Sequence, residues 1–250
     1  MTAPPTLSSA VTARTSKRMN IEVFADDDAV AKAAAGVIAA EARKAVAERG
    51  RFLMAVSGGK TPWAMLKDLA SEDVPWAQVH VFQIDERIAP EGDPDRNLTH
   101  LHESLLSSTQ GAAIPKENIH AMPVNAADPL QGAREYEKTL QNFCGNPPVL
   151  DLAHLGLGPD GHTASLIPGD PVLKVLEQDV ALTGVYQGRN RMTLTYPMIN
   201  RSRMILWLAT GAAKIPMIVR LKNADPSIPA GRIDQSTSLL LTDRAAAAGL

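Results

Sequence analysis

The sequence predicts an α/β fold in which a doubly wound, mostly parallel sheet carries helices on both faces. Short apolar segments alternate with longer amphipathic or alanine-rich segments along the chain, and this alternation is typical of parallel strands joined by helical connections. Several apolar segments are hydrophobic without interruption, as strands buried on both faces are. Glycine and polar residues follow these segments, at the edge where such sheets bind their ligands.

Length and composition favour one folded unit behind a short tail. The chain has 250 residues, of which 45% are hydrophobic, and this is enough for a large core. We expect a disordered tail over residues 1–19 and a single catalytic α/β domain over 20–250. The tail is rich in Ser, Thr, Ala and Pro and has basic residues but no acidic one, so a transit-like segment is the alternative.

The same numbers argue against several classes of partner. A net charge of −2 with 4% aromatic residues provides neither a basic stripe nor stacking platforms for nucleic acid. No apolar run is long enough to cross a bilayer. Cys144 is the only cysteine, which excludes an intrachain disulfide framework and fits a reducing compartment. We therefore expect a cytoplasmic protein, a monomer or small homo-oligomer, that binds neither nucleic acid nor membranes.

Local signals place the elements in the first half of the chain. Asp26, Asp27 and Asp28 can cap a long Ala-rich helix that runs towards Gly50. Pro62 suits the first turn of the next helix. The predicted strands are 20–24, 52–56 and 79–84 with a short apolar run at 119–122, the further helices are 63–70, 101–106 and 129–143, and a long polar loop occupies 88–97.

The second half continues the alternation. The apolar stretch Leu150 to Leu157 predicts a buried strand, followed by a glycine-rich turn and a helix that begins near Thr163. Segments 180–185 and 191–195 would form an antiparallel pair if the chain reverses at Gln187-Gly-Arg-Asn190. The remaining predicted elements are strands at 204–209 and 238–241 and a helix at 212–221.

The segment Gly156-Leu-Gly-Pro-Asp-Gly-His162 places a carboxylate and an imidazole two residues apart, directly after a predicted strand. At the carboxyl end of that strand, Asp160 and His162 would face the ligand crevice of a parallel sheet. His162 is a candidate catalytic residue because an imidazole changes charge near neutral pH. The alternative is that Asp160 only caps the following helix and His162 only fills a turn.

A second glycine loop lies between a predicted strand and a predicted helix. Its backbone N–H groups, hydroxyls and ammonium suit a phosphate or another oxyanion at a helix N-terminus. The spacing matches neither the Walker A motif nor the dinucleotide fingerprint, so neither ATP nor NAD is implied. The alternative is a turn with a purely structural role. The candidate phosphate-binding residues of this loop are Ser57, Gly58, Gly59, Lys60 and Thr61.

Three further candidate cations lie at other strand ends. Arg87 closes the triplet Asp85-Glu86-Arg87, whose Asp85 is a candidate catalytic carboxylate. Arg191 opens a predicted strand, and Lys214 lies in the first turn of a predicted helix. A lysine there opposes the helix dipole unless an anion is bound nearby. The alternative is that these residues are solvated charges at the surface.

No metal and no cofactor are expected. The remaining histidines lack the spacing of known metal-ligand motifs, and no carboxylate cluster accompanies them. These histidines are His80, His100, His102, His120 and His154.

Taken together, the motifs resemble those of the 6-phosphogluconolactonases, in the same order across about residues 20–241. The resemblance implies a fold related to that of the glucosamine-6-phosphate deaminases. It also implies hydrolysis of a sugar-phosphate lactone, 6-phospho-D-glucono-1,5-lactone, to 6-phosphogluconate in the pentose phosphate pathway. The motifs are Ser57-Gly-Gly-Lys-Thr-Pro62, Asp85-Glu-Arg87 with Asn97 downstream, Gly156-Leu-Gly-Pro-Asp-Gly-His-Thr-Ala-Ser165, Arg191-Met-Thr-Leu-Thr-Tyr-Pro-Met-Ile-Asn200 and Thr210-Gly-Ala-Ala-Lys214.

The deaminases are the nearest competitor, because they share the glycine loop and the Asp-Gly-His turn. In their pattern a glutamate associated with proton handling follows that turn, whereas Ile167 stands at the corresponding position here. An isoleucine transfers no proton, which favours the lactonase. A non-catalytic sugar-phosphate sensor is the alternative from another class of protein.

The resemblance implies a role for each candidate residue. Neutral His162 would take a proton from the water that attacks the lactone carbonyl, and either Asp160 or Asp85 would orient the imidazole or the water. The substrate phosphate would lie against residues 57–61, with Lys214, Arg87 and Arg191 nearby.

Overall fold

A computed structural model describes residues 18–107 and 113–250 of the chain. Most of the predicted tail therefore lies outside the described residues. Met19, at its end, is buried in the core. Among the described residues, no helix is long and apolar enough to cross a membrane.

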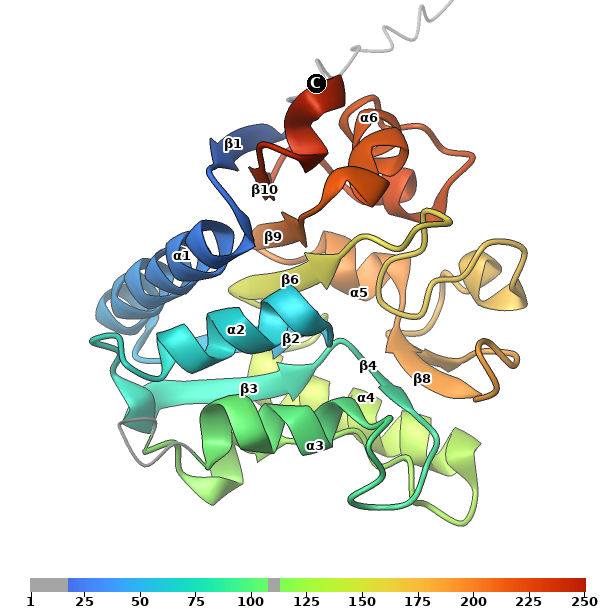
Figure 1. Cartoon of the computed structure of the whole chain (residues 1–250). Coiled ribbons are helices and arrows are strands. Elements are labelled where there is room, and N and C mark those ends of the chain that lie inside the picture. Colours follow the sequence, from blue (N-terminus) through green and yellow to red (C-terminus); the bar gives the residue numbers. More distant parts are fainter. Residues whose placement is uncertain (1–17, 108–112) are drawn as a thin grey trace, which may run out of the picture.

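Seven parallel strands form the main sheet of the described structure (Figure 1), which confirms the predicted fold class. Their order across the sheet differs from their order in the chain, as expected where helical connections pass over both faces. From one edge to the other the strands are β1 (Asn20–Phe24), β10 (Ser238–Asp243), β9 (Met204–Ala209), β6 (Leu152–Gly156), β2 (Phe52–Val56), β3 (Val79–Gln83) and β5 (Ile119–His120).

Each face of the sheet packs against its own set of helices. Strand β2 shows why: Phe52 and Met54 belong to one hydrophobic cluster, and Leu53 and Ala55 to the other, because successive side chains of a strand point to opposite faces. In Figure 1, α1, α2 and α3 lie in front of the sheet and α4 and α5 lie behind it. The helices are α1 (Asp27–Arg49), α2 (Lys60–Leu69), α3 (Asn97–Leu101), α4 (Pro129–Cys144), α5 (Tyr196–Asn200) and α6 (Ile215–Lys222).

The helix ends follow the predicted signals. The Asp26 carboxylate accepts a hydrogen bond from the Ala29 N–H at 2.9 Å, and Gly50 ends α1 in the left-handed conformation with φ 76°. Asp128 caps α4 in the same way, ahead of Pro129 in the first turn. Helix α2 starts directly after Gly59 without a side-chain cap, which leaves its first N–H groups without that partner.

A small three-stranded sheet stands beside the carboxyl ends of the main strands. Strands β7 (Val180–Leu182) and β8 (Arg191–Leu194) are antiparallel, as predicted. The third strand, β4 (Asp85–Arg87), was expected only as the end of the strand 79–84, but it pairs antiparallel with β8 in this separate sheet. This pairing brings Arg87 opposite Arg191. The small sheet therefore positions two of the three predicted cations.

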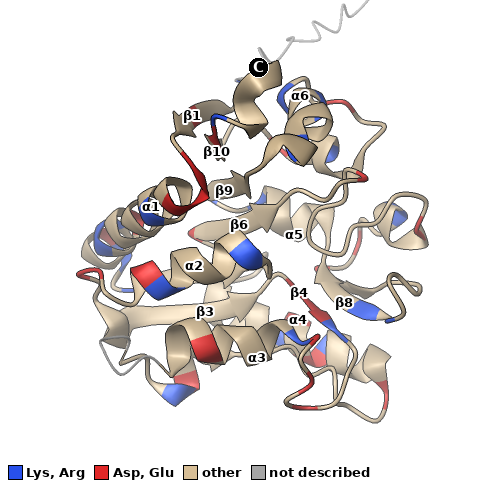
Figure 2. Cartoon of the chain, viewed as in Figure 1, with Lys and Arg blue, Asp and Glu red and all other residues tan. Residues whose placement is uncertain are grey.

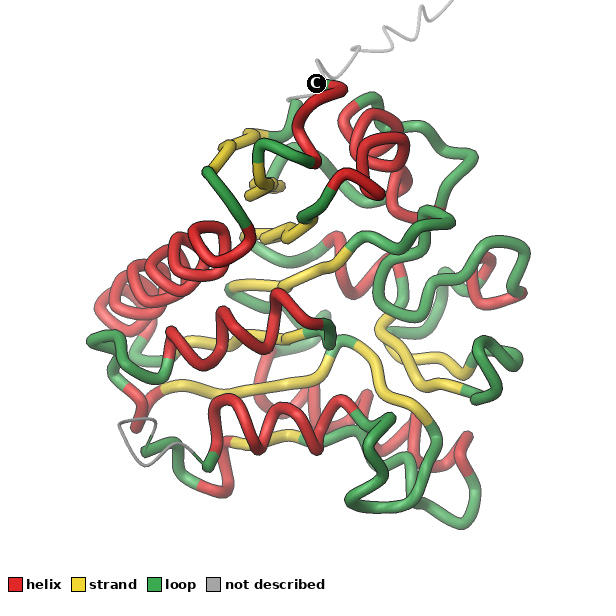
Figure 3. The backbone as a smooth tube through the Cα atoms, in the orientation of Figure 1, coloured by secondary structure: helices red, strands yellow, loops and turns green. Residues whose placement is uncertain are grey.

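The prediction of a helix that begins near Thr163 is wrong. Figure 3 shows the segment after β6 as a loop, in which the Leu166 N–H donates to the Thr163 carbonyl and Ala164 has φ 52°. The Thr163 hydroxyl donates to the Gly156 carbonyl at 2.8 Å. Thr and Ser side chains that form hydrogen bonds to backbone groups compete with helix formation. Most of the segment is also buried.

Candidate functional site

A cleft of about 630 Å³ lies at the carboxyl ends of the main strands, between them and the small sheet. All predicted site residues except Asp160 line this cleft. Figure 2 shows basic residues at the start of α2, on β4 and on β8, all near this edge. Segments distant in sequence meet here because parallel strands end at one edge of the sheet.

The glycine loop after β2 is attached to a buried histidine of β6. The Ser57 hydroxyl donates to the His154 carbonyl at 2.8 Å, and the Ser57 N–H donates to His154 Nδ1 at 3.3 Å. Complete burial lowers the pKa of His154 to about 3, so the ring is neutral and can accept this bond. Ser57 thus anchors the loop, and its hydroxyl proton is directed into the protein rather than into the cleft.

The rest of the loop presents backbone to the cleft. A Cβ on Gly58 would lie 2.0 Å from Asn97 Oδ1, so only glycine fits against that amide. Gly59 has φ 137°, which also favours glycine. Lys60 differs from the prediction: its side chain is 94% exposed, and its Nζ lies 3.5 Å from Asp27 Oδ2. The loop is suited to bind an oxyanion through N–H groups, with less help from Lys60 than expected.

Three cations face the cleft without an acidic side chain within 4.0 Å among the described residues. Lys214 Nζ donates to the Leu157 carbonyl at 2.6 Å. Partial burial lowers the pKa of Lys214, although nearby Asp160 opposes this effect. Arg87 donates to Asn97 Oδ1 at 2.8 Å, and Arg191 donates to Gln187 Oε1 at 3.2 Å.

The two arginines repel each other. Burial, followed by the charge of Arg87, lowers the pKa of Arg191. Both Nε atoms are buried and have no hydrogen-bond partner among the described residues. The charges of Asp85 and Asp95 offset part of this effect, but neither carboxylate forms an ion pair with the two arginines. Two cations this close are favoured when an anion binds between them, so this arrangement indicates an anionic ligand.

His162 is supported by a carboxylate and a phenol. Its Nδ1 lies 2.5 Å from Asp160 Oδ1, and the Tyr186 hydroxyl donates to Asp160 Oδ2 at 3.0 Å. Burial alone raises the pKa of Asp160, but the His162 N–H and imidazole and the Tyr186 hydroxyl outweigh it, and the pKa is lowered. An ionised Asp160 fixes the proton of a neutral imidazole on Nδ1. This leaves Nε2 as the basic nitrogen.

Asp85 lies elsewhere in the cleft. Its Oδ2 accepts a 2.6 Å hydrogen bond from the Ser165 hydroxyl, and Asn97 Nδ2 donates to its carbonyl at 2.9 Å. The structure shows no hydrogen bond between Asp85 and His162, so Asp160 is the predicted carboxylate that contacts the imidazole. Asp85 can order Ser165 and Asn97, or act on a bound ligand directly.

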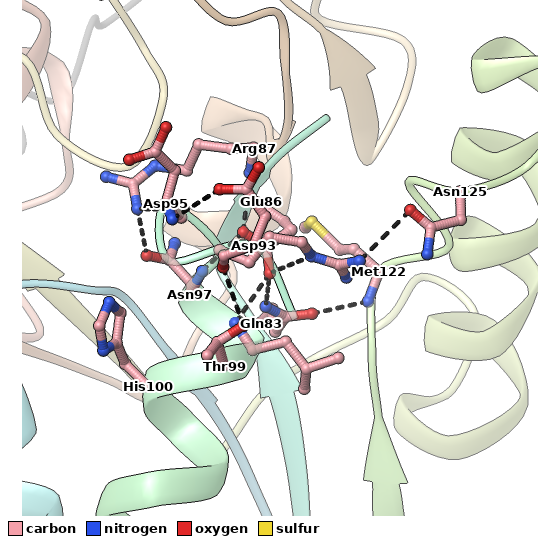
Figure 4. Close-up of polar contacts among 12 residues, drawn as sticks. Gln83, Glu86, Arg87, Asp93, Asp95, Asn97, Thr99, His100, Met122 and Asn125 are labelled. Atoms are coloured by element: carbon pink, nitrogen blue, oxygen red, sulfur yellow. Dashed lines mark hydrogen bonds and ion pairs between the residues drawn. The ribbon is translucent and has the colours of Figure 1, made fainter. Parts of the chain in front are cut away.

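The remaining acid of the triplet, Glu86, has a structural role that the sequence did not indicate (Figure 4). It is completely buried. Its Oε1 accepts from the N–H groups of Arg87 and Asn97, and its Oε2 accepts from the Leu98 N–H and from Gln83 Nε2, each at 2.8 Å. Glu86 also forms an ion pair with Arg96 at 3.4 Å. It therefore ties the C-terminal end of the loop 88–97 to β4.

Residues 18–107 and 113–250 contain no group of three His, Cys, Asp or Glu side chains placed to hold a metal ion. The cleft instead offers a supported imidazole, unpaired cations and a glycine loop. This combination suits proton transfer to or from a small anionic substrate.

Comparison with known proteins places this site in a family. The chain is 34% identical over 238 residues to a 6-phosphogluconolactonase of Nostoc sp., which covers 93% of this chain and 98% of the relative. It is 35% identical over 247 residues to the 6-phosphogluconolactonase of Mycobacterium tuberculosis, with 92% and 98% covered. The crystal structure of 6-phosphogluconolactonase from Thermotoga maritima has a TM-score of 0.79 at 26% identity, with 90% of this chain and 99% of the other covered.

A monomeric glucosamine-6-phosphate deaminase matches with a TM-score of 0.80 at 18% identity, covering 93% of this chain and 100% of the other. This likeness shows a shared fold alone.

The fold and the cleft define a doubly wound α/β enzyme with a site for an anionic substrate. The model of the glucosamine-6-phosphate isomerases/6-phosphogluconolactonases matches residues 25–241. The chain belongs to this family.

Proposed function

We propose that this protein hydrolyses 6-phospho-D-glucono-1,5-lactone to 6-phospho-D-gluconate in the oxidative pentose phosphate pathway, with His162 as general base. The observation that carries the proposal is the pairing of His162 with Asp160 beside three cations that lack acidic partners. A lactone is an activated ester that opens slowly in water, so base-assisted attack of water is sufficient. The names of the relatives support the substrate.

The phosphate of the substrate is held by the glycine loop and the cations of the cleft. The N–H groups of residues 58–61 bind it at the start of α2, and Lys214, Arg87 and Arg191 supply positive charge. The like charges of the two arginines support this placement, because the phosphate relieves their repulsion. Binding of the phosphate then fixes the lactone carbonyl near His162.

The chemical step uses His162 Nε2. Asp160 holds the proton of neutral His162 on Nδ1, so Nε2 removes a proton from water as the oxygen attacks the lactone carbonyl. Asp160 stabilises the imidazolium that forms. Backbone N–H groups or a cation of the cleft stabilise the oxyanion of the tetrahedral intermediate. The imidazolium returns its proton to the ring oxygen as the C–O bond breaks, which restores the base.

Ile167 supports lactone hydrolysis over deamination. It follows the Asp160–His162 turn, and it is buried. Its side chain has no group that can carry a proton, whereas amino-sugar ring opening needs further proton transfers. The same fold in a deaminase therefore does not argue for that activity here.

The first test measures opening of 6-phosphogluconolactone, generated in situ from glucose 6-phosphate, against its spontaneous hydrolysis. Wild type should accelerate opening, and His162→Ala should lose about 100-fold to 10,000-fold in kcat with little change in KM. Full turnover by His162→Ala would overturn the base assignment. If folded wild type does not accelerate opening, the substrate assignment is overturned. Ammonia release from glucosamine 6-phosphate would then be measured.

A further inference from the structure

Tyr186 lies where the base and one of the cations meet. It belongs to the connection between β7 and β8, whose reversal is closed by hydrogen bonds between the backbones of Tyr186 and Arg189 at 2.9 and 3.2 Å. Gln187 and Gly188 both have positive φ, at 51° and 80°, as a tight reversal requires. The turn thus sets the Tyr186 side chain in one direction, towards the loop after β6.

The two ends of the Tyr186 side chain make different contacts. Its hydroxyl donates to Asp160 Oδ2 at 3.0 Å, and the same oxygen lies 3.3 Å from His162 Nδ1. Its ring meets the imidazole edge to face, with centroids 5.3 Å apart. The guanidinium carbon of Arg191 lies over the ring, 5.0 Å from the centroid. One side chain therefore touches the base, its carboxylate and a cation of the cleft.

We propose that Tyr186 is a positioning residue that holds the Asp160–His162 pair through its hydroxyl and Arg191 through its ring. The inference rests on the proposed function, in which His162 removes a proton and Arg191 attracts the phosphate. The two parts of the Tyr186 side chain have different roles. The hydroxyl acts on the chemical step, and the ring acts on substrate binding.

The hydroxyl sets the basicity of His162 through Asp160. While the hydroxyl donates to Oδ2, part of the Asp160 charge is neutralised, and the attraction between Asp160 and the imidazolium is weaker. Burial, then Asp160, raises the pKa of the Tyr186 phenol, which keeps it protonated as the donor. Removal of the hydroxyl leaves the full carboxylate charge for His162 and therefore strengthens the attraction between Asp160 and the imidazolium.

Charged groups from the surrounding elements contribute to this balance. Lys214 interacts with Asp160 from the start of α6. Arg191 on β8 interacts with Tyr186, and Arg87 on β4 interacts with Arg191. These cations remain in place when Tyr186 is changed to phenylalanine, so the variant isolates the hydroxyl.

The turn is also attached to the loop 88–97. Arg189 forms ion pairs with Asp93 and Asp95 at 3.0 and 3.2 Å. Arg87 donates to the Asp95 carbonyl at 2.7 Å. Tyr186 is therefore carried by a segment that is fixed at both sides, which a positioning role requires.

Two variants separate the two contacts. Tyr186→Phe keeps the ring and removes the hydroxyl, and we expect the acid limb of the kcat/KM profile to move up by roughly 0.5–1 pH unit. The kcat value at low pH should fall with little change in KM. Tyr186→Leu also removes the ring beneath Arg191, and KM should then rise by roughly threefold or more. Tyr196→Phe is the matched control, because its buried hydroxyl donates to the Pro229 carbonyl outside the cleft.

A titration of His162 by NMR tests the inference without activity. The imidazole should titrate at higher pH in Tyr186→Phe than in wild type and unchanged in Tyr196→Phe. An unchanged titration of His162 in Tyr186→Phe, or an equal shift in Tyr196→Phe, overturns the positioning role, as does a Tyr186→Leu variant with wild-type KM. If wild type opens no lactone while His162 shifts as expected, the proposed function fails and the coupling stands.

Discussion

The imidazole of His162 occupies the space in which a side chain at Gly158 would lie. A Cβ on Gly158 would be 2.1 Å from His162 Nδ1 and 2.3 Å from Cε1. In addition, the Gly158 N–H donates to the His162 carbonyl at 2.8 Å. Gly158 therefore contacts both the backbone and the imidazole ring of His162. Glycine at this position is a condition for the orientation of the base.

A methyl group at Gly158 should displace the imidazole from Asp160. We expect Gly158→Ala to reduce kcat by roughly 100-fold, the effect of a misplacement of about 1 Å, because the ring is the closest group. Steady-state kinetics measures kcat, and circular dichroism checks that the variant is folded. Gly36→Ala is the control, since a Cβ there meets nothing within 4 Å. Normal turnover by Gly158→Ala would show that the ring can occupy another productive position.

Lys214 and Lys60 allow a matched test of phosphate binding. Lys214 is part-buried at the cleft, and Lys60 extends into solvent near Asp27. Lys214→Met should raise KM for the phosphorylated lactone by about 10-fold or more, because it removes a hydrogen bond to a charged group. Lys60→Met should change KM by less than about twofold, because solvent screens an exposed charge. Equal effects in the two variants would contradict this placement of the phosphate.

Residues in local motifs at strand ends were predictable, because the edge of a parallel sheet brings such motifs together. His162, Arg87 and Lys214 reached the cleft in this way. Tyr186 could not be predicted, because its contact with Asp160 depends on how the β7–β8 turn folds. Glu86 was part of a triplet read as solvated, and only the converging donors of the loop 88–97 explain its burial.

At the scale of the elements, β4 and the loop 88–97 form a single unit centred on Glu86. Four donors meet its two oxygens, and Arg96 supplies the opposite charge. Asn97, at the start of α3, then contacts Arg87 and lies against Gly58. The C-terminal end of the loop is thus anchored to β4.

Glu86→Gln should destabilise this unit. An amide group places an NH₂ where a carboxylate oxygen accepted two hydrogen bonds, and it leaves Arg96 without a buried counter-charge. The free energy of unfolding should fall by about 3 kcal/mol or more, and KM should rise as Arg87 and Asn97 lose their support. Urea unfolding and kinetics measure both effects. Glu103→Gln, at an exposed position, should change neither, and an equally stable Glu86→Gln would refute the anchoring role.

Element prediction succeeded where a pattern was long and failed where short polar side chains intervened. The buried strands of the main sheet and the long helices α1 and α4 have strong local signals, and they form as expected. The segment after β6 contains Thr163 and Ser165, whose hydroxyls bond to Gly156 and to Asp85. The contact with Asp85 spans 80 residues, so no local pattern could indicate it.

For the whole molecule, the buried histidines predict how stability depends on pH. Burial lowers the pKa of His154 to about 3, and burial together with His80 lowers the pKa of His120 to about 4. In the unfolded chain both titrate near 6.5. Between these values the unfolded chain binds protons that the folded protein does not, so stability falls as the pH decreases below about 6.5.

Each of these histidines should reduce the free energy of unfolding by up to about 2 kcal/mol between pH 7 and pH 5. Urea unfolding at the two pH values measures the loss. His120→Phe retains a ring beside Phe82 and Phe143 and should make the loss smaller. His102→Gln, at an exposed position, should leave it unchanged. A loss that is identical in His120→Phe would assign the pH dependence to other groups.

The order of the strands also bears on when the protein can fold during its synthesis. The first strand, β1, occupies an edge of the main sheet, and its one neighbour there is β10, the last strand. Residues 20–24 leave the ribosome long before their partners at 239–243. Helix α1 likewise contacts β9 and β10. Strand β1 must therefore remain unpaired until β10 has been synthesised.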